Sequence, residues 1–77
     1  MKEQDRLFIV VETLESQIAM LSPIVEDLRA EDNGGNTDMA EYWYRPCTQR
    51  ACSDLSYLRR DLRFTMRDFD AAVHHDY

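Results

Sequence analysis

The chain has 77 residues with a formal net charge of −6, and 44% of the residues are hydrophobic. A chain this short is expected to form one domain (residues 1–77) that buries only about 60% of its unfolded surface, so a lone helical pair would be marginally stable. The negative charge disfavours nonspecific binding to nucleic acid or anionic membranes, which leaves proteins as the expected partners. No run of 18 apolar residues and no secretory-signal pattern is present, which predicts a cytoplasmic protein outside the membrane.

Apolar residues recur in alternating steps of four and three along the first half of the chain. They are Leu7, Val11, Leu14, Ile18, Leu21, Val25 and Leu28. The second half carries the same spacing in mirror image about Gly34 and Gly35, so residues whose numbers sum to 69, such as Leu14 and Leu55, are expected to face each other. This 3.5-residue repeat is typical of packed helices, and its mirror image predicts an all-α antiparallel helical hairpin.

The first helix is predicted over about residues 3–31, the loop over 32–37 and the second helix over about 38–73. Asp38 and Glu41 have the spacing of a capping box, which favours this start for the second helix. Pro23 and Pro46 each interrupt one expected helix, and their numbers also sum to 69. We therefore expect two long helices that kink at the same height of the hairpin.

Several apolar residues lie beyond what the hairpin seam can cover. Around Leu7 the first helix is apolar on almost every side, and the second helix is expected to extend past the first. The residues left over, which we assign to a dimer interface, are Phe8, Ile9, Val10, Met66 and Phe69. The sequence thus predicts a homodimer in the form of a four-helix bundle.

Tyr42, Trp43 and Arg45 form the best candidate for a partner-binding surface, because Trp, Tyr and Arg dominate the energetics of protein interfaces. The alternative is that this cluster caps the loop end of the bundle. The neighbouring Tyr44 falls on the seam and is expected in the core.

Arg59, Arg63 and Arg67 repeat every four residues and form a second candidate binding surface. Like charges at this spacing destabilise a helix unless acids answer them. Acids of the first helix, such as Glu3 and Glu12, are candidates for that role; an acidic protein partner, or phosphate and nucleic acid, are the alternatives.

No metal site, cofactor site or catalytic site is predicted. His74 and His75 are adjacent, so on a helix they diverge by about 100° and cannot hold one ion together. Cys47 and Cys52 lie on different faces of the expected helix, which suits neither a disulfide nor a shared metal. The histidines lie more than twenty residues from either thiol, so no nucleophile and base converge, and an enzyme is not expected.

These observations favour a small acidic cytoplasmic module that binds and modulates another protein, in the manner of a phage-encoded inhibitor or an adaptor, without catalysis. One alternative is a DNA mimic, whose acids imitate phosphates to block a nucleic-acid-binding protein. Another is an antitoxin or nucleic-acid-binding regulator that uses the arginines of the second helix; the net charge disfavours direct binding to nucleic acid.

Overall fold

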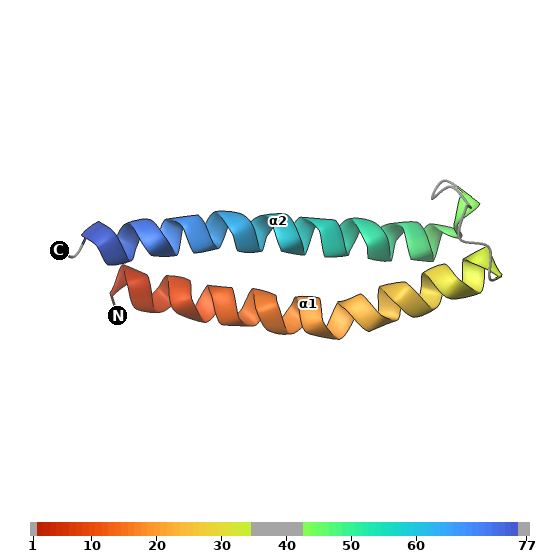
Figure 1. Cartoon of the computed structure of the whole chain (residues 1–77), viewed down its shortest axis with the longest axis horizontal. Coiled ribbons are helices and arrows are strands. Elements are labelled where there is room, and N and C mark those ends of the chain that lie inside the picture. Colours follow the sequence, from red (N-terminus) through yellow and green to blue (C-terminus); the bar gives the residue numbers. More distant parts are fainter. Residues whose placement is uncertain (1, 35–42, 76–77) are drawn as a thin grey trace.

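The computed structural model describes residues 2–34 and 43–75 and has two helices, α1 (Glu3–Asn33) and α2 (Pro46–His75). They run antiparallel along a rod of 53 × 18 × 17 Å, with the start of α1 and the end of α2 at the same end of the rod (Figure 1). The described residues contain no strand. The prediction of an all-α hairpin with two helices packed against each other is confirmed.

The two ends of α1 follow simple local chemistry. Its first turn contains Glu3 and Asp5, whose carboxylates are favourable beside the positive end of a helix. The helix stops at Gly34, which has φ of 56° and donates its backbone N–H to the carbonyls of Ala30 and Glu31. Glycine is favoured at this position because it has no Cβ and adopts the left-handed backbone conformation without steric strain.

Pro23 lies inside α1 without dividing it, as expected. Proline removes one backbone N–H and presses on the carbonyl four residues earlier, so the helix must bend to accommodate it. The hydroxyl of the preceding residue, Ser22, donates to the Ile18 carbonyl of the same helix at 2.7 Å. Figure 1 shows α1 changing direction near its middle and bowing away from α2.

The predicted start of α2 is wrong. The helix begins at Pro46, and residues 43–45 are not part of it, whereas Asp38 and Glu41 lie outside the described residues. Pro46 therefore occupies the first helical position, where proline's fixed φ fits and its missing N–H costs nothing. The prediction of a second kink at Pro46 is wrong for the same reason, and α1 alone carries an internal proline.

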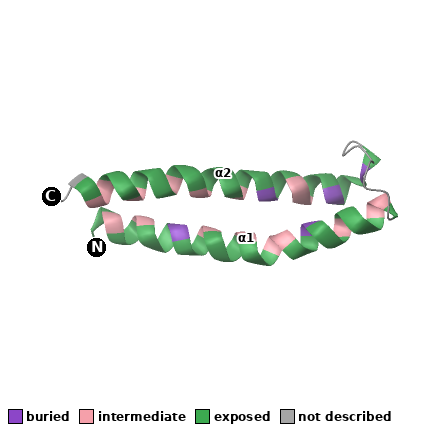
Figure 2. Cartoon of the chain, in the orientation of Figure 1, coloured by how far each residue is buried: buried purple, intermediate pink, exposed green. Residues whose placement is uncertain are grey.

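The core follows the predicted 3.5-residue repeat. Buried apolar residues are Val11, Val25, Tyr44 and Leu55, and Thr48 is fully buried. The other members of the first-half repeat are half-buried, and Figure 2 shows the buried positions on the sides of the two helices that face each other. The assignment of Tyr44 to the core is confirmed.

The predicted register is wrong by about one heptad. The Phe8 and Phe69 rings lie 5.9 Å apart between centroids, and Arg45 bonds to Asp32; in both pairs the residue numbers sum to 77 rather than 69. In an antiparallel heptad seam, sliding one helix by about seven residues brings apolar residues opposite each other again. The sequence pattern alone therefore cannot choose among these alignments. The expected overhang of Phe69 is also corrected, because it packs on Phe8 of the same chain.

Candidate functional site

Much of the apolar surface of this chain is exposed. The exposed large apolar residues are Phe8, Ile9, Val10, Met20, Ile24, Trp43, Tyr57, Phe64 and Met66. They outnumber the four buried apolar residues of the core. Single exposed apolar residues are ordinary, but clusters of them mark interaction surfaces.

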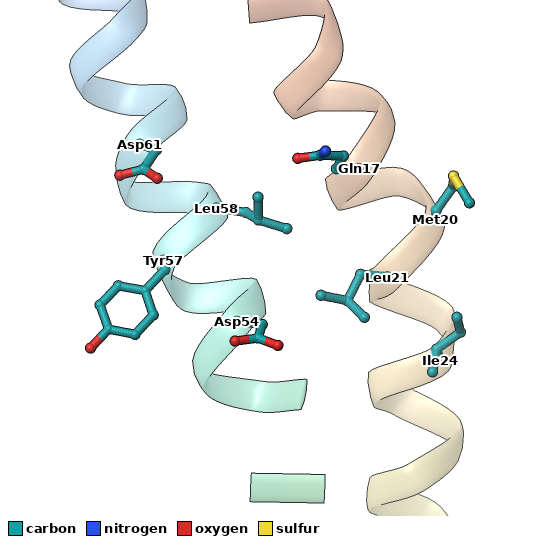
Figure 3. Close-up of a pocket in the computed structure, with 8 residues that line it drawn as sticks. All are labelled: Gln17, Met20, Leu21, Ile24, Asp54, Tyr57, Leu58 and Asp61. Carbon is teal, nitrogen blue, oxygen red and sulfur yellow. The ribbon is translucent and has the colours of Figure 1, made fainter. Parts of the chain in front are cut away.

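Three of these residues, Met20, Ile24 and Tyr57, line a groove of about 520 Å³ along the middle of the hairpin, which we call the central groove. Its lining residues are Gln17, Met20, Leu21, Ile24, Asp54, Tyr57, Leu58 and Asp61. Leu21 and Leu58 lie between the helices, while Tyr57 stands on the outer side of α2 (Figure 3). Met20 is 72% exposed, so the groove presents apolar side chains directly to solvent.

Charges on α2 border the central groove in a regular order. Asp54 and Asp61 are both exposed and lie seven residues apart, and Asp68 follows after the same interval. The Arg60 guanidinium lies over the Tyr57 ring at 4.9 Å, and that of Arg67 lies over Phe64 at 6.0 Å. Of these residues only Asp54, Tyr57 and Asp61 line the groove. Arginines stacked on aromatic rings are frequent at protein interfaces, whereas aspartate is depleted there.

The sequence reasoning missed this groove because the apolar residues that it assigned outside the seam lie near the two chain ends, at residues 8–10 and at Met66 and Phe69. A second seven-residue rhythm beside the seam marks the same face: Val10, Gln17 and Ile24 on α1. Tyr57 and Phe64 repeat it on α2. This signal is weak, because Gln17 is polar and Tyr57 is the one member of the α2 pair that lines the groove.

Arg45 ties the two helices together at the loop end. Its backbone N–H and its Nε donate to the two carboxylate oxygens of Asp32 at 2.9 and 2.6 Å, and its Nη2 donates to Glu31 at 3.0 Å. The Asp32 side chain is only 4% exposed. Arg45, expected on a partner-binding surface, thus has a structural role immediately before the first residue of α2.

Asp32 has a lowered pKa as a result of this arrangement. Desolvation pushes its pKa upwards, but hydrogen bonds from Thr48 and from the backbone and side chain of Arg45, with the Arg45 charge, together hold the pKa below 3.8. The same pairing raises the pKa of Arg45, through the hydrogen bonds to Asp32 first and Glu31 second. The pair therefore favours the folded state only while Asp32 is ionised.

We expect Asp32→Asn to reduce the loss of stability in acid. Because the folded pKa lies below the unfolded value near 3.8, the carboxylate stabilises the fold fully above that pH and loses its contribution as the pH falls through the folded pKa. Urea unfolding at pH 7 and pH 3 measures the effect at fixed protein concentration.

Arg45→Gln serves as the second variant, because it removes the charge while keeping the backbone N–H. It should also flatten the pH dependence. If both variants lose as much stability between pH 7 and pH 3 as the wild type, the contact between Asp32 and Arg45 does not contribute to the stability of the fold.

Trp43 remains a candidate contact residue, since its side chain is 68% exposed. With Glu31, Asp32 and Arg45 it borders a hollow of about 380 Å³ at the loop end. Tyr42 lies outside the described residues. Of the predicted loop-end cluster, the structure therefore places Trp43 alone in a position open to a partner.

The three arginines of the second candidate surface do not act as one group. Arg59 and Arg63 border a shallow hollow with Ser56 and Leu62, whereas Arg67 lies over the Phe64 ring. In the part of the chain that the structure describes, no ion pair joins any of them to the acids of α1, so the expected pairing with Glu3 or Glu12 is wrong within the chain.

The five residues assigned to a dimer interface are spread over more than one face. Phe8, Ile9, Val10 and Met66 are exposed, while Phe69 is half-buried against Phe8. Val10 lies seven residues before Gln17 and so in the same row of α1, whereas Phe8 belongs to a different row.

Cys47 is exposed and Cys52 is half-buried, and no disulfide joins them. Within residues 2–34 and 43–75, no group of three or more His, Cys, Asp or Glu side chains is placed to hold a metal ion.

By length and composition, α1 meets the criterion for a membrane span, with a mean hydropathy of 1.4 over its most apolar 18 residues. Buried core helices of soluble proteins and signal sequences near the N-terminus pass the same test, and little of this part of α1 is buried. The absence of an uninterrupted apolar run therefore does not by itself keep α1 out of a membrane, contrary to the expectation from the sequence.

No family model matches this chain, and no curated protein or solved structure resembles it significantly.

Proposed function

We propose that this protein is a cytoplasmic, non-catalytic interaction module that forms a homodimeric four-helix bundle and binds and modulates another protein. The observation that carries the proposal is the amount of exposed surface. A compact monomer of 9.1 kDa is expected to expose about 4,900 Å², whereas this chain exposes 6045 Å². The excess of roughly 1,100 Å² is comparable to what one partner contributes to a standard interface, about 800 Å².

The charges of α1 support a location outside the membrane. Glu12 and Glu15 lie in the middle of its most apolar part, and both are exposed. Ionised side chains at the centre of a membrane helix are costly unless they are paired or face a cavity. A bundle in water covers the apolar rows of α1 while leaving these carboxylates solvated.

Within this proposal, Trp43 is the residue that engages the modulated protein. The loop end of the hairpin is the end of a four-helix bundle, so Trp43 stays accessible when the long faces are covered. A tryptophan supplies a large contact area with few rotamers to restrict, and exposed tryptophans are frequent interface hot spots.

Trp43→Ala is therefore expected to weaken capture of the partner by on the order of 2 kcal/mol or more. Tagged protein would be used to capture partners from cells that encode it, followed by titration of the enriched protein. Sedimentation equilibrium should return about twice 9.1 kDa for the wild type and for the variant.

His74→Ala is the matched control, because His74 is also exposed but lies at the opposite end of the rod. It should change neither capture nor mass. Equal capture by wild type and Trp43→Ala would remove Trp43 from the contact surface, and a folded monomer would contradict the dimeric module itself.

A further inference from the structure

The residues that line the central groove come from one face of each helix. Those of α1 are Gln17, Met20, Leu21 and Ile24, and those of α2 are Asp54, Tyr57, Leu58 and Asp61. Each set has the spacing i, i+3, i+4 and i+7, which places four side chains on one face of a helix over about two turns. Two such faces side by side form the kind of groove into which a third α-helix packs with apolar residues at the same spacing.

The floor of the groove is a part of the seam that the hairpin leaves open. Leu21 and Leu58 lie between the helices but are only half-buried, whereas Leu55 is 6% exposed (Figure 3). The groove lies where α1 bows away from α2, around Pro23 (Figure 1). Apolar side chains of a further helix would therefore remove from water a surface that the two helices do not cover for each other.

Both charged residues that line the groove are acidic. Asp54 and Asp61 lie on either side of Leu58 along α2 (Figure 3) and are about 10.5 Å apart along the helix axis. Within the described part of the chain, neither carboxylate has an ion pair or a hydrogen bond, and this includes Arg50, which lies one turn before Asp54. A partner that covers the groove must supply cations beside α2, because unpaired carboxylates are costly to remove from water.

A second copy of the same groove does not meet this requirement. None of the described residues that line the groove is an arginine or a lysine, so two copies placed face to face bring carboxylates together without cations. The apolar residues assigned to the dimer interface lie at another height of the rod, at residues 8–10 and at Met66 and Phe69. The occupant of the groove is therefore argued separately from the dimer.

We infer that the central groove binds an amphipathic α-helix with one basic border, presented by the protein that this module modulates. The apolar face of that helix packs on Leu21 and Leu58. Two lysines or arginines seven residues apart along one border of the helix pair with Asp54 and Asp61. The opposite border, which lies over α1, needs no charge, because the lining residues of α1 are Gln17 and apolar residues. The inference rests on the proposed function and names the chemical class of its partner.

Two synthetic helical peptides test the charge requirement. The basic probe is about five turns long, with leucines spaced three and four residues apart on one face and two lysines seven residues apart on one border of that face. The acidic probe has glutamate in place of both lysines. At low salt, fluorescence anisotropy of the labelled peptides should show at least about fivefold tighter binding of the basic probe. This preference should weaken as the salt concentration rises.

Charge reversal in the protein should reverse the preference. Asp54→Lys combined with Asp61→Lys should bind the acidic probe more tightly than the basic one. Glu26→Lys combined with Asp70→Lys is the matched control, because it changes the net charge by the same amount at exposed positions. Glu26 lies about 180° from Gln17 around α1, and Asp70 lies about 160° from Asp54 around α2. The control should still bind the basic probe more tightly.

Met20→Ser tests the apolar contact. Met20 is 72% exposed, so the fold does not depend on it, but a helix in the groove would cover it. The variant should bind both probes at least about fivefold more weakly than the wild type. Ala19→Ser is the control, because Ala19 is exposed and lies about 100° away around the helix. It should change the affinity for neither probe.

The outcomes separate this inference from the proposed function. Equal binding of the two probes, binding of neither, or a preference that Asp54→Lys with Asp61→Lys leaves unchanged overturns the basic helix while the dimeric module stands. If the wild type binds neither probe and the same double reversal shifts the dissociation constant of the dimer, the occupant is a second copy and the inference is wrong. A folded monomer that selects the basic probe contradicts the proposed dimer and supports the inference.

Discussion

Leu55→Ala is expected to lower the free energy of unfolding by about 2–5 kcal/mol, the largest stability effect of the substitutions considered for this chain. Leu55 is 6% exposed and is one of four buried apolar residues among those that the structure describes, so few neighbours remain to close the cavity that alanine leaves. Urea unfolding followed by helical circular dichroism measures the loss, at one fixed protein concentration because dimerisation adds to apparent stability.

Ser56→Ala is the control for this substitution. Ser56 is the next residue on α2 and is exposed, so its replacement should change the free energy of unfolding by less than about 0.5 kcal/mol. A Leu55→Ala variant as stable as Ser56→Ala would mean that the seam does not hold the hairpin together.

The second prediction concerns the register of the two helices. Leu21 and Leu58 both line the central groove and lie between the helices in Figure 3, so Leu21→Ala and Leu58→Ala should be non-additive by about 0.5 kcal/mol or more. Leu14 and Leu55, which face each other in the register expected from the sequence, are offset by about 12 Å along the axis in the structure. Their double variant should be additive within about 0.5 kcal/mol.

The two double-mutant cycles, run side by side, decide the register. Coupling between Leu14 and Leu55 together with additivity between Leu21 and Leu58 would support the register expected from the sequence, with its shorter loop, and would contradict the observed packing.

The position of Pro46 shows how the loop end sets this register. Starting α2 at Pro46 gives a longer connection than the six-residue turn read from the glycine pair, and Arg45 then reaches Asp32 at the end of α1. The hydrogen bond between these two residues and the Phe8–Phe69 contact at the other end of the rod both correspond to the same alignment of the two helices. The alignment is thus supported at both ends of the hairpin.

Local patterns were enough to predict the helices, the course of α1 through Pro23, the seam and the burial of Tyr44. These features depend on spacing along one helix or on the conformational preferences of single residues such as Gly34. Both can be read directly from the amino-acid sequence. The start of α2, the role of Arg45 and the heptad register were not predictable in the same way. A repeating seam has several alignments of nearly equal apolar contact, and the choice among them depends on loop length and on contacts between residues far apart in the chain, such as Asp32 with Arg45.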